Sequence, residues 1–331
     1  MEQLLSLLKT IPEYAAMVSS LQDGESVAVT GIGQINRSHM IAGLCRTLNR
    51  PMVVLCQDDL AARRLQEELK GFLADTAPIL PGRDLTLYDA AVVSRSWEQK
   101  RLRQLHDLAV GKTGLQIMTW ESLSLRTMPK AALLAAAFSL EVGREYAVED
   151  LISRLTAAGY NRCGMVEGPG QFAVRGGILD IFSPAEDRPV RAEFFGDELD
   201  TMGFFDPATQ RRSENITSVT VLPVAETQPG LHPGGVEGLC KDITSLISRQ
   251  KRRKNINEPL IATLEKDLNK YESGLHNPAS DRYMALIYPE MATAADYIPD
   301  GAVVAVCDHG NLQRAARSRC DEMGMQLDSM L

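Results

Sequence analysis

The feature that most constrains the fold is an alternation of short β-branched runs with longer helical periods between about Glu25 and Trp120. Strand-helix-strand units of this kind build parallel sheets. The pattern predicts strands at Ser26–Thr30, Pro51–Cys56, Ala77–Leu80 and Leu115–Thr119. Apolar residues at three- and four-residue steps predict helices at Ser38–Leu48, Asp59–Leu73 and Ser96–Val110. We therefore expect an open α/β domain at the front of the chain.

The pattern changes after Ala131. A helix at Val148–Ala158 is followed by closely spaced short strands, separated by Gly, Pro, Asp and Asn turn signals, at Gln171–Arg175, Ile178–Phe182, Val190–Phe195 and Ile216–Leu222. This middle part is predicted to be a small antiparallel α+β unit.

The α/β pattern returns after Pro223. A charged helical stretch to about Ser273 precedes a predicted strand at Ala302–Cys307 and a helix from Asn311. The middle unit therefore looks inserted. We predict three segments: 1–134 as the first part of an α/β domain, 135–222 as the inserted α+β domain, and 223–331 as the remainder of the α/β domain.

Composition narrows the class of protein. The chain has 331 residues, a formal net charge of −8, and 44% hydrophobic and 24% charged residues. Two compact units are the usual expectation for this length. No apolar run approaches the roughly 20 residues of a membrane helix, and the N-terminus resembles a helix more than a signal peptide, so a cytoplasmic protein is predicted. Six widely separated cysteines without a C-x-x-C pair argue against disulfides and zinc.

The segment GIGQINRS lies where a phosphate-binding loop would connect a strand to a helix. It fits G-x-x-x-x-G-K-[ST] at only two defining positions, Gly31 and Ser38. Asn36 stands where the second glycine lets the backbone curl around phosphates, and Arg37 replaces the compact ammonium of lysine. The loop is therefore predicted to be degenerate and to bind no nucleotide.

An outward-facing set of arginine and phenylalanine is predicted for two strands of the middle unit. Because side chains alternate across a strand, Arg175 faces away from Phe172 and Val174. Arg191 and Phe195 likewise face away from the apolar side of their strand. Such side chains are enriched at protein interfaces. The arrangement fits a cross-strand Arg-Glu pair with an incidentally exposed Phe equally well, so the residues alone leave both interpretations open.

Other candidate sites have weaker support. The basic run Arg249–Lys254 could contact nucleic-acid phosphates, but such runs are more often a solvated helix face, and the chain as a whole is acidic. We expect weak or no DNA binding. Asp308 follows an apolar run, but one carboxylate beside His309 defines no metal site. No catalytic residue, metal or cofactor is assigned to the chain.

The segment Gly159–Asp200, with Phe205–Arg212 after it, closely resembles the module shared by UvrB and the bacterial transcription-repair coupling factors (Mfd). It contains their G-x-F-x-V-R-G-G-I-x-D-I-F and R-x-E-F-F-G-D-E segments. The similarity extends upstream through Val27–Leu48 and Leu80–Asp89 and weakens beyond about residue 225. UvrB is an ATPase with G-K-T in its loop, so the degenerate loop favours Mfd. UvrB's tyrosine-rich, DNA-probing hairpin has no counterpart between Tyr88 and Trp120.

The resemblance implies the N-terminal part of Mfd, in which an inactive, helicase-type (RecA-like) domain holds an inserted domain that binds the repair protein UvrA. The family's UvrA-contacting positions fall on Arg175, Arg191 and Phe195. Motor domains elsewhere in the full-length protein would use ATP and Mg to translocate on DNA and push stalled RNA polymerase. No enzyme activity is expected of this chain. The alternative is a divergent UvrB-type ATP-dependent DNA-repair enzyme.

Overall fold

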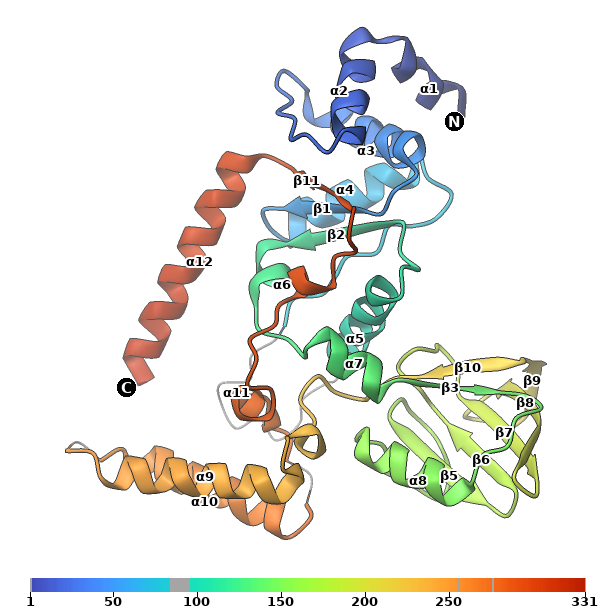
Figure 1. Cartoon of the computed structure of the whole chain (residues 1–331), viewed down its shortest axis with the longest axis vertical. Coiled ribbons are helices and arrows are strands. Elements are labelled where there is room, and N and C mark those ends of the chain that lie inside the picture. Colours follow the sequence, from blue (N-terminus) through green and yellow to red (C-terminus); the bar gives the residue numbers. More distant parts are fainter. Residues whose placement is uncertain (1, 84–95, 255, 276, 331) are drawn as a thin grey trace. The chain divides into compact units, whose positions relative to one another are not determined.

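A computed structural model describes residues 2–83, 96–254, 256–275 and 277–330 (Figure 1). The chain forms two compact units, each built from segments far apart in sequence. The first unit comprises Met1–Arg83, Gln104–Leu125 and Ala294–Leu331, and the second comprises Asp84–Arg103 and Arg126–Thr293. The fold is mixed α/β, with a parallel sheet in the first unit and antiparallel pairing in the second, as the sequence predicts in outline.

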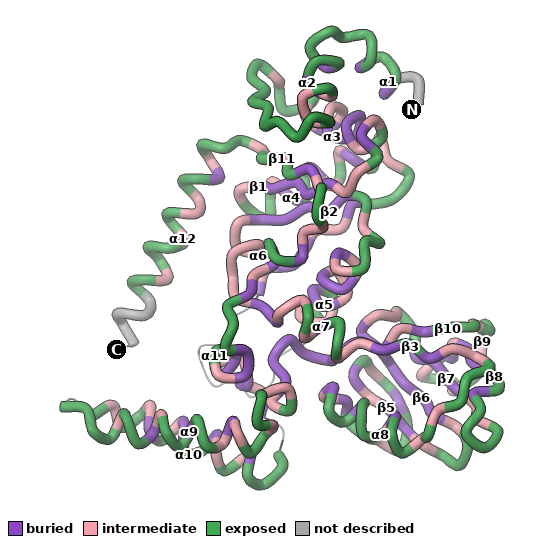
Figure 2. Tube along the Cα trace, viewed as in Figure 1, coloured by how far each residue is buried: buried purple, intermediate pink, exposed green. Residues whose placement is uncertain are grey.

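The first unit is centred on a three-stranded parallel sheet in the order β11-β1-β2. Its strands are β1 (Met52–Cys56), β2 (Leu115–Thr119) and β11 (Val303–Val306). Every residue of β1 and β2 is buried (Figure 2), as expected for strands of a parallel sheet that is covered on both faces. The sheet therefore forms the base of this unit's core.

Helices complete the first unit. α4 (Asp59–Lys70) and α6 (Trp120–Ser124) contact the sheet, and α3 (Gln34–Leu48) packs on α4. α1 (Glu2–Leu7) and α2 (Pro12–Gln22) contact α3, and α12 (His309–Met330) contacts α6. α5 (Ser96–Ala109) contributes residues to both units. The Asp58 carboxylate accepts a hydrogen bond from the backbone N–H of Ala61 at 2.8 Å and so caps the start of α4. Ala62, Leu65 and Leu69 on one side of α4 join the core.

Two predicted strands of this unit differ from the structure. Ser26–Thr30 forms no strand, and all of its residues are exposed. A strand is stabilised by a neighbour that satisfies its backbone N–H and C=O groups, and the described sheet ends at β11 without pairing to this segment. Ala77–Leu80 contributes only an isolated bridge between Ile79 and Ile117. Most of the Leu80–Asp89 resemblance and part of the Tyr88–Trp120 stretch lie outside the described residues.

The second unit contains a six-stranded sheet in the order β4-β5-β6-β7-β8-β9. Its strands are β4 (Asn161–Arg162), β5 (Gln171–Arg175), β6 (Ile178–Ile181), β7 (Val190–Phe195), β8 (Glu198–Phe205) and β9 (Arg212–Asn215). β4 pairs parallel to β5, and the other pairs are antiparallel. The sequence predicts β5, β6 and β7, but it predicts no strand at β4, β8 or β9.

One face of this sheet packs on a core completed by other elements. These are the antiparallel pair β3 (Phe138–Glu141) and β10 (Ser218–Val221) and the helix α8 (Val148–Ala157). Their buried side chains include Leu140, Leu151 and Val219, which join Phe172 of β5 and Ala192 of β7 in one cluster. We call the opposite face of the sheet, which carries Arg175, Asp180, Arg191 and Glu193, the outer face.

The rest of the second unit is mainly helical. It includes α7 (Lys130–Ala136), α9 (Gly235–Lys251), α10 (Glu258–Glu272) and α11 (Met284–Ile287). The single helical stretch predicted up to Ser273 is in fact two helices, because Asn257 caps a new start through its bond to the N–H of Leu260 at 3.0 Å. Short 3-10 turns lie at Leu8–Thr10 and Ala294–Tyr297 in the first unit, and at Pro229–Leu231 and Ser280–Tyr283 in the second. Among the described residues, no helix has both the length and the apolar character to cross a bilayer.

Candidate partner-binding surface

Two glycines set the hairpin that carries the outer face. Gly176 follows β5 with φ +59°, a left-handed conformation that glycine adopts without strain. At Gly177, a Cβ atom would lie 2.7 Å from the carbonyl oxygen of Phe194, and the Phe194 N–H donates to the Gly177 carbonyl at 2.7 Å. The R-G-G-I segment therefore turns the chain and lets β7 approach closely.

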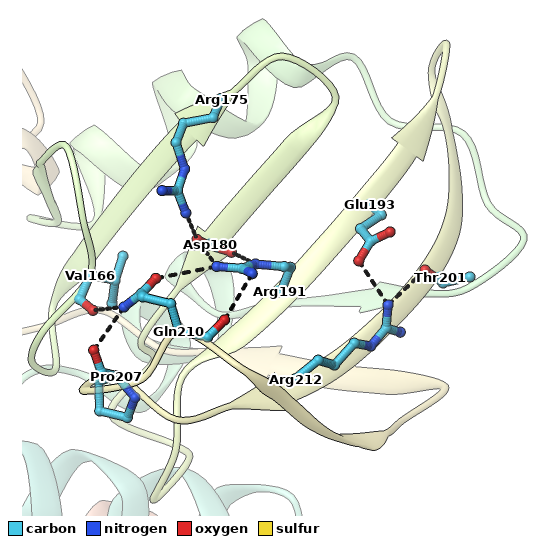
Figure 3. Close-up of polar contacts among 9 residues, drawn as sticks. All are labelled: Val166, Arg175, Asp180, Arg191, Glu193, Thr201, Pro207, Gln210 and Arg212. Carbon is cyan, nitrogen blue, oxygen red and sulfur yellow. Dashed lines mark hydrogen bonds and ion pairs between the residues drawn. The ribbon is translucent and has the colours of Figure 1, made fainter.

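At the centre of the outer face, two arginines bind one buried carboxylate (Figure 3). Asp180 is fully buried and lies directly opposite Arg191 in the β6–β7 pairing. Arg191 donates hydrogen bonds to both carboxylate oxygens, from Nε to Oδ1 at 2.7 Å and from Nη2 to Oδ2 at 2.9 Å. Arg175 donates from Nη2 to Oδ2 at 2.6 Å. Two cations thus neutralise a carboxylate that water cannot reach.

Arg191 is held on all sides and is only 16% exposed at its side chain. Its Nη1 donates to the Gln210 carbonyl at 3.2 Å, and its Nη2 lies 3.3 Å from Gln210 Oε1. The guanidinium also lies over the Phe205 ring, 4.6 Å from its centroid. The hydrogen bond to Asp180 raises the pKa of Arg191 above its ordinary value. Arg191 therefore has a structural role in addition to any contact with a partner.

A second ion pair lies beside the first on the same face. Arg212 donates from Nη1 to Glu193 at 2.9 Å and to the Thr201 hydroxyl at 3.0 Å (Figure 3). Gly203 leaves room for the guanidinium of Arg212, because a Cβ atom at position 203 would lie 2.5 Å from Nε of Arg212. A cross-strand Arg-Glu pair, as considered from the sequence, is thus present, and it joins Arg212 of β9 to Glu193 of β7.

The other two predicted contact residues are accessible. Phe195 ends β7 beside the turn residue Gly196 and is 84% exposed. Arg175 keeps 47% of its side chain exposed while it contacts Asp180. An aromatic ring left almost wholly in water has no role in the core of this unit. The outer face therefore presents one free apolar ring and one half-exposed cation.

Side-chain alternation predicts the inner face of the sheet correctly and the outer face only in part. Phe172 and Val174 lie in the core as predicted, with Phe172 fully buried. On the outer face, however, Ala173 is also buried, in a small cluster with Val166, Phe182 and Phe205. Sequence reasoning also missed Asp180. Its signal was a lone carboxylate inside the apolar run of Ile178–Phe182.

The predicted degenerate loop lies in the first unit, beside the ends of β1 and β11. Gly31 has φ +80°, and Gly33 precedes α3 with no side-chain cap. Asn36 is exposed, and Ser38 is buried. Arg37 lines a pocket of about 250 Å³ whose other walls include Asp58, Arg64, Cys307 and Asp308. The charge of Arg37 lowers the pKa of Cys307, which lines the same pocket.

The remaining candidate residues, Asp308 and the basic run, do not come together as a site in the part of the chain that the structure describes. Asp308 accepts hydrogen bonds from the backbone and side-chain nitrogens of Asn311 at 3.2 and 2.6 Å, and so serves the start of α12. Within the part of the chain that the structure describes, no cluster of three or more His, Cys, Asp or Glu side chains could hold a metal. In the basic run, Lys251 pairs with Glu265 at 2.8 Å, and the residues from Lys251 to Lys254 are exposed.

Comparisons with known proteins identify the relatives of this chain. Residues 138–226 match the family model of the UvrB interaction domain. A transcription-repair-coupling factor of Bacillus subtilis is 25% identical over 92% of the chain and 26% of its own length. That of Myxococcus xanthus is 33% identical over 64% of the chain and 18% of its own length. That of Staphylococcus aureus strain Mu50 is 26% identical over 88% of the chain and 25% of its own length.

The chain thus spans about a quarter or less of the length of these relatives. The UvrB interaction domain begins at the start of β3 and covers the six-stranded sheet with its ion pairs and Phe195. The matches confirm the resemblance stated from the sequence: the chain is similar to the N-terminal region of transcription-repair-coupling factors and contains a UvrB interaction domain.

Proposed function

We propose that the outer face of the six-stranded sheet binds the repair protein UvrA and so recruits it in transcription-coupled DNA repair. The observation that carries this proposal is Phe195, an aromatic ring that is 84% exposed within a matched UvrB interaction domain. Burial of such a ring at the centre of an interface can contribute about 2 kcal/mol or more. Arg175 supplies a half-exposed cation on the same face.

The three predicted contact residues have different roles. Phe195 and Arg175 face the partner, and Arg191 holds the buried Asp180 and keeps the strands beneath them in register. Because Arg191 already donates to Asp180 and Gln210, it has little freedom to rearrange on binding. The surface is therefore preorganised, which lowers the entropic cost of association.

The proposed role of the first unit is that of a scaffold without ATPase activity. Asn36 takes the place of the glycine that a phosphate cradle needs, and Arg37 interacts with Cys307. ATP and Mg, stalled RNA polymerase and DNA would be bound by other domains of a cytoplasmic full-length protein. Titration of this chain with ATP and Mg tests the point, because saturable binding or turnover would support a divergent UvrB-type enzyme instead.

The UvrA interaction is tested by calorimetric titration of the chain with purified UvrA. Phe195→Ala is expected to weaken binding by about 2 kcal/mol, roughly 30-fold in Kd. Met291→Ala provides the matched control, since Met291 is 74% exposed in the same unit but lies outside the sheet. The control should bind like the wild type. Equal affinities of the Phe195 variant and the wild type would refute the proposed surface.

A further inference from the structure

Two cysteines that are 251 positions apart in the chain lie side by side in the first unit. β1 and β11 pair in parallel with Leu55 opposite Val306, so the next residues along, Cys56 and Cys307, stand opposite each other. The Cys307 N–H donates to the Leu55 carbonyl at 3.0 Å, which extends the pairing to this position. Adjacent strands lie about 4.8 Å apart, within the Cα separations of about 4.4–6.8 Å that a disulfide spans.

The two thiols also influence each other. Each one changes the pKa of the other, and all six cysteines of the chain are free thiols in the structure. Both residues line the pocket of about 250 Å³ at the strand ends, where Cys307 is partly exposed. A small oxidant can therefore reach Cys307, whereas Cys56, its neighbour on β1, is buried.

The environment makes the two thiols unequal. The hydrogen bond from Cys56 lowers the pKa of Cys307, and the charge and hydrogen bond of Arg37 lower it further. The hydrogen bond to Cys307 and burial raise the pKa of Cys56. A thiolate is the nucleophilic form of cysteine, and a reactive cysteine sits in a partly exposed, positively charged environment. Because Cys307 is also partly exposed whereas Cys56 is buried, Cys307 is the attacking group and Cys56 the resolving one.

We propose that Cys56 and Cys307 form a reversible, peroxide-sensitive disulfide that ties β1 to β11. The Cys307 thiolate attacks one oxygen of hydrogen peroxide, the O–O bond breaks, and the products are a sulfenic acid on Cys307 and hydroxide. The Cys56 sulfur then attacks the Cys307 sulfur, the S–O bond breaks, and the departing hydroxide takes up the Cys56 proton as water. The hydroxide of the first step takes up the proton that Cys307 released on ionising, so two thiols are oxidised by two electrons and one peroxide is reduced to two waters. A dithiol reductant reverses the bond.

This site gives Arg37 a use that does not involve a nucleotide. At the position where a phosphate-binding loop carries lysine, Arg37 lines the same pocket as Cys307 and lowers the pKa of that thiol. The bond would join segments that are distant in sequence, and it would leave the outer face of the second unit untouched. Oxidation would therefore act on the stability of the first unit.

The test treats the full chain with hydrogen peroxide, blocks the remaining thiols after denaturation, and maps the peptides by mass spectrometry. We expect a linked Cys56–Cys307 peptide, two fewer blocked thiols, and a loss of the mass of two hydrogen atoms, all reversed by dithiothreitol. Cys56→Ser should leave a sulfenic acid on Cys307 that dimedone traps. Cys45→Ser is the matched control in the same unit, where burial raises the thiol pKa to about 11, and it should keep the link.

Two outcomes would contradict the proposed disulfide. Recovery of Cys56 and Cys307 as blocked free thiols, under conditions that oxidise the exposed Cys320, would overturn the proposal. A disulfide that persists in Cys307→Ser would overturn it too. Thermal unfolding of each variant in reductant shows that the variants are folded, so that loss of the link reports the loss of the thiol.

Discussion

Replacing Arg191 with alanine should destabilise the second unit much more than removing a surface charge. Asp180 is fully buried. The Asp180 carboxylate accepts three hydrogen bonds, and Arg191 donates two of the three hydrogen bonds, at 2.7 and 2.9 Å. Removal of one partner from a buried ion pair costs roughly 3–5 kcal/mol. Arg175 remains bound to Oδ2 at 2.6 Å and offsets part of this loss, so we expect about 3 kcal/mol.

Arg188→Ala is the matched control for this measurement. Arg188 pairs with Glu214 at 2.7 Å, but both side chains are about half exposed, and its guanidinium covers the Phe204 ring. Its loss should cost about 1 kcal/mol. Urea unfolding followed by circular dichroism gives both values. Asp180→Asn should rescue part of the Arg191→Ala loss, because it removes the charge of a buried carboxylate that has lost two of its three hydrogen bonds. A loss of stability in Arg191→Ala no larger than that in Arg188→Ala would contradict the structural role of the Arg191–Asp180 pair.

Three further predictions concern other parts of the second unit. Gly177→Ala should destabilise the sheet by more than about 1 kcal/mol in urea unfolding, because the alanine Cβ would lie 2.7 Å from the Phe194 carbonyl oxygen. A variant as stable as the wild type would refute this close approach. Burial raises the pKa of Tyr271 from 10.0 to about 12, so the free energy of unfolding should fall as pH rises through this window, and less so in Tyr271→Phe. Duplex DNA should bind weakly, with little change on neutralising Arg252 and Arg253; tight, salt-dependent binding would contradict this.

The sequence predicts well where the burial pattern is regular. The fully apolar run of β1 and the amphipathic α4 lie where their periodicity places them. The middle strands β5 and β7 also follow their alternation, with Phe172 and Ala192 inside. In these segments the same residues that favour a strand or helix also face the core, so local and tertiary preferences agree.

The sequence predicts poorly where structure depends on a distant partner. Ser26–Thr30 has the β-branched composition of a strand but finds no neighbour in the described sheet. β9 (Arg212–Asn215) is polar throughout, and it pairs only because β8 presents an edge to it. The roles of Asp180 and Gln210 at the candidate site likewise depend on strand register, which residue spacing does not reveal.

The central claim, that the outer face binds UvrA, is tested most directly by photo-crosslinking at the exposed aromatic position. A chain with Phe195→p-benzoylphenylalanine places the reactive group on the surface without removing the aromatic ring. Mixed with UvrA and irradiated, it should give a covalent complex of the two chains. The same group at the exposed Met291, outside the sheet, should give none. Crosslinking to UvrA from position 291 but not from position 195 would contradict the account.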